Sequence, residues 1–124
     1  MDTSNIFEQE WIKFFEISYD GIIIADGKGY IIYMNPASER LEEVKKENII
    51  GKHAKDLESK GIYEQSVTLR ILKSKKPITV MQNKGNKQLI ITGIPIYENR
   101  EIKWIFVNER DITELNKIKK EMGK

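Results

Sequence analysis

Two hydrophobic periods meet near the end of the chain, between residues 102 and 122. From Ile102 to Val107, apolar side chains fall on both faces of an extended chain, which is typical of a central strand covered on both sides. Beyond the polar residues 108–111, Leu115, Ile118 and Met122 recur at three and four residues, the period of a helix. The pattern predicts a central strand that continues almost directly into an amphipathic helix. Such a connection can carry a change in the core out of the domain.

The same two periods predict the elements upstream. Short β-branched runs bounded by turns predict strands at residues 21–26, 30–34, 78–82 and 88–97. Helical spacing predicts an N-terminal helix and helices at residues 37–44 and 63–75, with polar turns at 45–59 between them. Antiparallel hairpins with helices grouped between them indicate an α+β fold with the helices on one face of the sheet.

The N-terminal helix carries an aromatic stripe made by Phe7, Trp11, Phe14 and Phe15. This is more apolar surface than one helix leaves in contact with water. We therefore expect the helix to pack on its own sheet, on the same helix of a second copy, or on both.

Composition narrows the function classes. A chain of 124 residues with 40% hydrophobic and 32% charged residues suits one globular domain. The net charge of +2 is too balanced to indicate direct binding of nucleic acid or of an anionic membrane. Apolar runs of about four residues are far short of the ~20 that span a bilayer, and no signal-peptide pattern opens the chain. We expect a cytoplasmic domain with no membrane segment.

Residues that could carry catalysis are scattered. Because the chain has no cysteine, it has no disulfide, thiolate metal site or cysteine nucleophile. The absence of cysteine also fits a reducing compartment. The single histidine, His53, is interpreted as a polar loop residue, and residues 27–29 form a hairpin turn and no phosphate loop. The carboxylates of Glu42, Glu43 and Glu98 are expected to be solvated. We predict that the segment is not an enzyme and holds no metal.

Four short motifs follow one another at characteristic distances. They are Asp26-x-x-Gly29 in a hairpin turn, Asn35-x-Ala37 opening a helix with Leu41, Ile50-Gly51-Lys52, and Asp111-Ile112-Thr113. In this order they resemble a PAS domain over residues 20–113. The resemblance implies a five-stranded antiparallel sheet with small helices over one face, enclosing a ligand pocket. It divides the chain into an N-terminal flanking helix (1–17), the PAS domain (18–113) and the start of a C-terminal linker helix (114–124).

A finer resemblance suggests the host protein. Residues 92–96 and 107–115 are similar to the sensory PAS module of bacterial sigma-54-dependent transcription activators. This implies a sensory and dimerisation module that binds a small ligand or partner and relays the signal to a transcription-regulating output domain. The alternatives are the PAS domain of a sensor histidine kinase from a two-component system, and a structural dimerisation domain whose pocket is filled by its own side chains.

The resemblance also implies roles for single residues. PAS domains dimerise through flanking helices, which implies a homodimer built on Phe7, Trp11, Phe14, Leu115 and Ile118. The pocket candidates are Tyr63, Val67, Arg70, Ile71, Thr92 and Val107. We interpret Arg70 as reaching solvent and Thr92 as satisfying a backbone group. If a ligand binds, the hypothesis is a small polar or anionic molecule held by Arg70.

The junction between the last strand and helix is the implied route of the signal. Asp111, Ile112 and Thr113 form it, and either Asp111 or Thr113 is expected to be the N-cap of the helix. Stiffening by such a cap would let the junction transmit motion.

Three features found in family members are missing from this chain. Haem-binding members carry a histidine on the long helix, and residues 63–75 contain none; covalent flavin needs a cysteine. The cofactor therefore stays unknown, with non-covalent flavin as an alternative. Where many members have glycine and then an aromatic residue, this chain has Glu43 and Val44. A left-handed turn there would cost a non-glycine residue ~1 kcal/mol.

Overall fold

A computed structural model describes residues 3–123, with side chains from residue 10 onward. Five strands form one antiparallel sheet in the order β2-β1-β5-β4-β3, which puts β5 in the centre. In chain order the elements are α1 (Thr3–Ile17), β1 (Gly21–Asp26), β2 (Ile31–Met34), α2 (Pro36–Glu42), the 3-10 helix η1 (Lys46–Asn48), α3 (Ala54–Ser59), α4 (Val67–Ser74), β3 (Ile78–Lys84), β4 (Lys87–Glu98), β5 (Glu101–Asp111) and α5 (Thr113–Met122).

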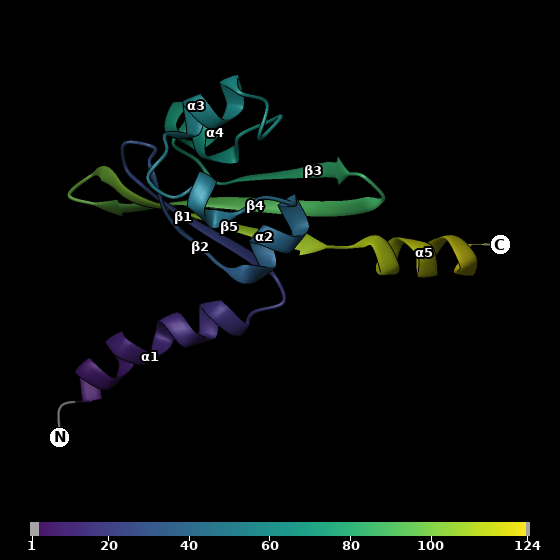
Figure 1. Ribbon diagram of the computed structural model, residues 1–124, viewed down its shortest axis with the longest axis horizontal. Coiled ribbons are helices and arrows are strands. Elements are labelled where there is room, and N and C mark those ends of the chain that lie inside the picture. The colour runs from purple at the N-terminus through teal and green to yellow at the C-terminus, as the bar shows by residue number, and fades with distance from the viewer. Residues whose placement is uncertain (1–2, 124) are drawn as a thin grey trace.

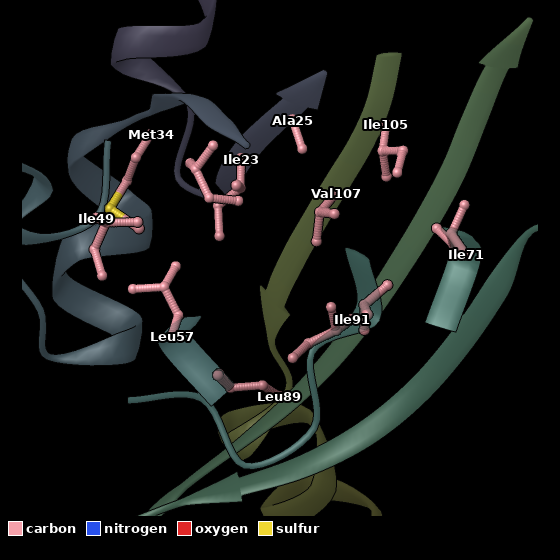
Figure 2. Packing of buried hydrophobic residues seen from close by; sticks show 12 residues of the cluster. Ile23, Ala25, Met34, Ile49, Leu57, Ile71, Leu89, Ile91, Ile105 and Val107 are labelled. Carbon is pink, nitrogen blue, oxygen red and sulfur yellow. The ribbon is translucent and has the colours of Figure 1, made fainter. Parts of the chain in front are cut away.

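The predicted α+β class is confirmed, and the helices divide between the two faces of the sheet. Figure 1 shows α3 and α4 over one face and α1 on the opposite side, with α5 extending away from the end of β5. The core lies between the sheet and α2–α4, and Figure 2 shows its apolar side chains. Its fully buried members include Ile49, Ile71, Leu89 and Ile105.

The central strand β5 contacts the core on one face of the sheet and helix α1 on the other. Ile105 and Val107 are buried in the core under α2–α4. Phe106, between them, faces the other layer, where its ring centroid lies 6.0 Å from that of Phe15 on α1. Successive side chains of a strand point to opposite faces, so one strand contacts both the core and the N-terminal helix.

Two predicted boundaries are wrong, each for a local reason. The last strand does not end at Val107 but continues to Asp111, because β4 pairs with it as far as Leu89 opposite Asp111. The helix predicted at 63–75 begins only at Val67, because the Ser66 hydroxyl accepts the backbone N–H of Leu69 at 3.2 Å and so caps it there. Residues 63–66 are a loop over the core. The segment 45–59 contains two short helices, η1 and α3, in addition to polar turns, which gives four small helices between β2 and β3.

Helix α2 begins and ends in well-defined caps. Asn35 is the N-cap and Pro36 is the first helical residue, a position where the missing N–H of proline costs nothing. At the other end Glu43 has φ 58° and ψ 45°, so the left-handed turn is kept without glycine. Its N–H still donates to the carbonyl of Glu39.

We expect Glu43→Gly to raise the free energy of unfolding by ~0.5–1 kcal/mol, because glycine takes up the left-handed conformation without the steric cost of a Cβ. Urea unfolding measures the change. Glu43→Ala, which keeps a Cβ, is the control and should give no gain. Equal stability of the glycine and alanine variants would contradict the expectation.

Candidate functional site

A small cavity lies between the inner face of the sheet and the loop before α4. Its volume is about 30 Å³, which is room for one water-sized species and far less than the ~300–1,000 Å³ of common ligand sites. Its apolar walls come from the core of the domain. The lining residues are Ile23, Ile31, Glu42, Ala54, Leu57, Tyr63, Gln65, Ser66, Val67, Thr68, Gln82, Ile91, Val107 and Glu109.

Two carboxyl groups are buried at this cavity. Glu42 on α2 and Glu109 on β5 each expose 1% of their surface. The Ser38 hydroxyl donates to Glu109 Oε1 at 2.5 Å. In the part of the chain that the structure describes, both carboxylate oxygens of Glu42 and the hydroxyl of Tyr63 are buried without a hydrogen-bond partner. The nearest cation, Lys84 Nζ, lies 4.0 Å from Glu42 Oε2, which is an ion pair at long range.

Burial and the neighbouring acid determine the protonation of this cluster. Burial first, and then the contact with Glu42 and its charge, raise the pKa of Glu109 well above its usual value, while Ser38 and Lys84 oppose the shift. Because ionised carboxylates only accept hydrogen bonds, a hydrogen bond between the two acids requires a proton on one of them. Burial, and then the charges of Glu109 and Glu42, raise the pKa of Tyr63, so this phenol is neutral. The burial of two adjacent acids therefore favours a proton on Glu109.

The local sequence explains why these groups meet. Ser38 and Glu42 are four residues apart on α2 and so share one face of the helix. Glu109 continues the inward alternation of Ile105 and Val107 along β5. Opposite it in β1 stands Gly21, where an added Cβ would lie 2.5 Å from Glu109 Oε1. The absence of a side chain at Gly21 leaves room for the acid.

The structure brings three of the six pocket candidates to this cavity: Tyr63, Val67 and Val107. Ile71 is buried in the core close to Gly93, where an added Cβ would lie 2.4 Å from Ile71 Cδ1. It is not among the residues that line the cavity.

Arg70 and Thr92 do not reach the cavity. Helix α4 turns Val67, Thr68 and Ile71 inward, which leaves Arg70 exposed on the opposite side. Thr92 lies on the outer face of the sheet, where its hydroxyl is 3.2 Å from that of Thr79. The hypothesis of an anion held by Arg70 inside the pocket is therefore wrong.

The acids were missed at the sequence level. Glu42 was expected to be solvated, and the polar run 108–111 was interpreted as the end of the strand. Both are wrong, because α2 packs its Ser38–Glu42 face onto the sheet and β5 continues through Glu109. The period of two that joins Ile105, Val107 and Glu109 was the available signal.

His53 has a local structural role. Its Nδ1 accepts the backbone N–H of Lys55 at 3.0 Å, which caps α3, and its Nε2 lies 2.7 Å from the carbonyl of Lys28. This arrangement suits the neutral ring with the proton on Nε2, donating to Lys28. His53 thus joins α3 to the β1–β2 turn.

The β5–α5 junction is held by the start of β4. Ile112 is the cap residue of α5 and makes no side-chain cap, so the prediction that Asp111 or Thr113 is the N-cap is wrong. Thr113 is instead the first helical residue: its N–H donates to Asp111 Oδ1, and its hydroxyl accepts the N–H of Gln88 at 2.9 Å. The Ile112 N–H donates to the Gln88 carbonyl at 2.8 Å. The junction is therefore tied sideways to β4.

We expect Thr113→Ala to loosen the first turn of α5 while leaving the core intact, with a cost of ~1 kcal/mol or less, because it removes one part-buried hydrogen bond to β4. Hydrogen exchange of the α5 amides should become faster, and Tm should change little. Thr79→Ala, on the open face of the sheet, is the control and should leave α5 unchanged. A large loss of Tm in Thr113→Ala would contradict this role.

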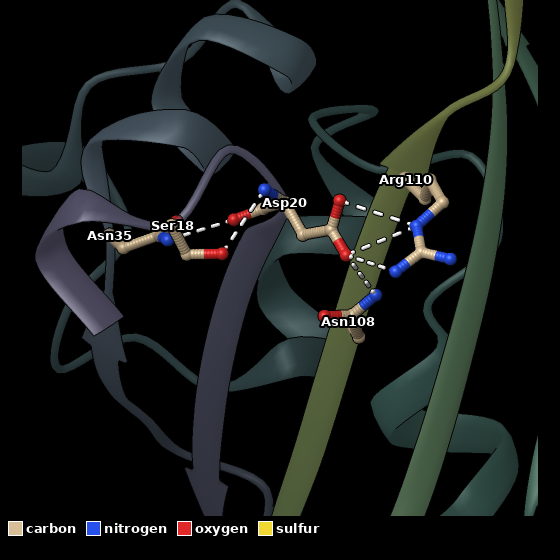
Figure 3. A network of polar contacts seen from close by, with 5 residues as sticks. All are labelled: Ser18, Asp20, Asn35, Asn108 and Arg110. Atoms are coloured by element: carbon tan, nitrogen blue, oxygen red, sulfur yellow. Dashed lines mark hydrogen bonds and ion pairs between the residues drawn. The ribbon is translucent and has the colours of Figure 1, made fainter. Parts of the chain in front are cut away.

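A second polar cluster fastens α1 to the domain (Figure 3). The Asn35 side chain donates to the carbonyl of Phe15 at 2.8 Å. It also donates to the carbonyl of Asp20 at 2.9 Å. Asp20 in turn accepts from Arg110 at 2.9 Å and from Asn108 at 3.2 Å. The end of α1 is thus connected to both α2 and β5.

Apolar side chains on the flanking helices remain exposed. Trp11 and Phe14 on α1 are 52% and 62% exposed, and Leu115 and Ile118 on α5 are 51% and 50% exposed. The side chain of Phe7, the remaining dimer candidate, lies outside the described residues.

The described residues contain neither a membrane-spanning helix nor a cluster of metal ligands. No helix there is both long enough and apolar enough to cross a bilayer. No group of three or more Asp, Glu, His or Cys side chains there is arranged to hold a metal ion.

Comparisons with known proteins agree with the geometry. The family model described as "PAS domain" matches residues 20–114. The sensor protein CitS of Halalkalibacterium halodurans is 27% identical in an alignment of length 117. That alignment covers 84% of this chain and 19% of CitS. The chain thus spans about a fifth of the length of this relative.

Solved structures show the same fold at low identity. A PAS domain from Colwellia psychrerythraea is 23% identical with a TM-score of 0.61, covering 87% of this chain and 98% of that one. The PAS domain of BvgS from Bordetella pertussis is 14% identical with a TM-score of 0.63, covering 94% of each chain. The PAS domain of nitrogen regulation protein NR(II) from Vibrio parahaemolyticus is 20% identical with a TM-score of 0.53, covering 81% and 95%.

Proposed function

Because the chain belongs to the PAS domain family and is a sensory domain, we propose that it is the input module of a larger signalling protein and passes its signal out through α5. The observation that carries this proposal is the position of β5. Its inner residues Val107 and Glu109 line the cavity, its outer residue Phe106 contacts α1, and only Ile112 separates it from α5. A change in the cavity thus has a short covalent path to both flanking helices.

The output favoured by the comparisons is a sensor kinase of a two-component system. CitS is named a sensor protein, and another solved relative is the PAS domain of histidine kinase ThkA. The sigma-54-dependent activator remains the second candidate, supported by the resemblance of residues 92–96 and 107–115. In either host the segment itself is the sensory part, and catalysis would belong to another domain. We propose a cytoplasmic location on the absence of cysteine.

A relay through α5 is tested by altering the cavity and observing the helix. Glu109→Gln changes the buried acid pair, and we expect it to change hydrogen exchange of the α5 amides several-fold. The double variant Glu109→Gln/Thr113→Ala should lose that coupling, since the tie to β4 is removed. Unchanged exchange in α5 on Glu109→Gln, with a folded core, would refute the relay.

We further propose that the module works as a homodimer through its flanking helices. The exposed apolar side chains of Trp11, Phe14, Leu115 and Ile118 support this, since such surface is usually covered by a partner. Sedimentation equilibrium should show a dimer that Phe14→Ser weakens. Lys13→Ser, on the same helix, is the matched control and should keep the dimer. A monomeric wild-type chain at high concentration would refute this proposal.

A further inference from the structure

Three buried oxygen atoms at the cavity have no hydrogen-bond partner among the described residues. They are both carboxylate oxygens of Glu42, a residue only 1% exposed, and the hydroxyl oxygen of Tyr63. Buried polar atoms are nearly always paired, and an unpaired carboxylate is among the most costly exceptions. These atoms come from α2 and from the loop before α4, and both residues line the same cavity. The geometry therefore calls for a donor between them.

When Glu109 is ionised, the side chains around Glu42 in the described part of the chain supply it with no donor within hydrogen-bond distance. The Ser38 hydroxyl is already used by Glu109. Lys84 Nζ on β3 is 4.0 Å from Glu42 Oε2, beyond hydrogen-bond distance, and its side chain is 27% exposed. With Glu109 alongside, the site carries two acids and one distant cation. The missing donor should therefore be positively charged.

The chemistry of the site distinguishes among cations. A primary ammonium group has three N–H donors, which the two unpaired carboxylate oxygens of Glu42 and the Tyr63 oxygen can accept, while the Tyr63 O–H stays free to donate. Calcium takes six to eight oxygen ligands and magnesium keeps several waters, whereas the walls here are largely apolar, among them Ile23, Ile91 and Val107. A volume of about 30 Å³ excludes bulky amines. We propose that this cavity is a binding site for a small ammonium cation, either NH4+ itself or a short primary alkylammonium ion, held by Glu42, Tyr63 and Glu109.

Binding of the cation at this cavity does not depend on a relay through α5. The further step, that this cation is the signal that the domain senses, rests on the proposed function. A proton is the natural competitor, because a protonated Glu109 can donate to Glu42 in place of the ammonium group. The charged and titratable groups that face the site are Glu42, Glu109, Tyr63 and Lys84. Ammonium binding should therefore weaken as the pH falls and Glu109 takes up a proton.

The test is the thermal unfolding of the full chain at pH 7.5 with chloride salts at equal ionic strength. Ammonium and methylammonium should raise Tm by roughly 5 °C or more at saturating concentration, and less at pH 5. Tetramethylammonium, which has no N–H donor, should have no effect. Calorimetry should give a Kd at least tenfold weaker for Tyr63→Phe, and no binding for Glu42→Gln. Glu43→Gln, the same change at the exposed neighbour, is the matched control and should bind as wild type.

Equal shifts with tetramethylammonium would overturn the proposal in favour of a general salt effect. No shift with any of the amines would overturn it in favour of a site that holds only a proton. A shift with magnesium or calcium but not with ammonium would overturn it in favour of a metal site. Ammonium binding without any change in hydrogen exchange of α5 would leave the binding site in place and refute its role in the relay.

Discussion

Replacing Asn35 by alanine should lower the free energy of unfolding by ~3–4 kcal/mol, the largest single effect expected in this domain. The Asn35 side chain is fully buried and makes four hydrogen bonds. Its oxygen accepts the backbone N–H groups of Ile22 and Ser38, and its amide donates to the carbonyls of Phe15 and Asp20. Alanine would remove the acceptor of two buried N–H groups, those of Ile22 and Ser38, and the donor to two part-buried carbonyls, and it would remove the N-cap of α2. Urea unfolding measures the loss.

Two variants determine where that effect arises. Asn108→Ala is the matched control, because Asn108 makes one part-buried side-chain contact, to Asp20, and should cost less than ~1 kcal/mol. Asn35→Asp keeps both acceptor contacts but loses the two donors to Phe15 and Asp20. It should therefore release the end of α1 while keeping the α2 cap. A cost below ~1 kcal/mol for Asn35→Ala would show that α1 and α2 are held by packing alone.

The buried acid pair should make the domain less stable as the pH rises from about 5 to 8. The pKa of Glu109 is raised in the folded state, above all by burial and then by Glu42. Below the pKa of the unfolded chain both states hold the proton, and its contribution to stability is complete. As the pH rises through the folded pKa, that contribution is lost, at ~1.4 kcal/mol for each pKa unit of the shift.

We expect Glu109→Gln to flatten this part of the pH profile and to be more stable than wild type at pH 8. Gln cannot ionise, so it keeps the neutral form next to Glu42 at every pH. Unfolding in urea at fixed pH values from 5 to 8 measures both curves. The control is Glu98→Gln, in an exposed strand end, which should follow wild type. A wild-type curve that is flat or rises over this range would contradict the raised pKa.

At acid pH the stability of the domain should change in the opposite direction and fall as the pH is lowered. Burial acts to raise the pKa of Asp20, but its hydrogen bonds with Arg110 and Asn108 outweigh burial and lower it. The pKa of Asp111 is lowered by its hydrogen bonds with Thr113. These contributions are present above the unfolded pKa of an aspartate, ~4, and are lost as the pH falls through the folded values. Stability should therefore be greatest near pH 5, between the two limbs.

The fold could be predicted because its signals are local. The alternation along β5, the turn at Asp26–Gly29 and the Asn35–Pro36 cap each lie within a few residues, and each predicted element exists. The acids at the cavity could not be predicted in the same way. Whether Glu109 is buried depends on Ser38 and Glu42, which are more than sixty residues away and reach it only through the packing of α2 on the sheet.

The same distinction explains the errors at α4 and at the junction. The start of α4 depends on one Ser66 hydroxyl, and the apolar period continues upstream of it to Tyr63, so periodicity alone placed the helix too early. Thr113 has the residue type of a cap, but its hydroxyl accepts from Gln88 on β4, a partner that only the strand pairing brings close. Arg70 is a pocket candidate that does not face the pocket, because the sequence does not show which side of α4 faces the sheet.

The absence of a side chain at Gly21 limits how positions 21 and 109 can vary during evolution. Since any Cβ at this position would lie 2.5 Å from the Glu109 carboxylate, the two positions cannot vary independently. Among related sequences, glycine at position 21 should coincide with an acid at position 109, and lineages that replaced the acid by a small neutral residue should be free to acquire alanine or serine at position 21. Covariation of this pair would identify which relatives inherited the acidic cavity and which retained only the fold.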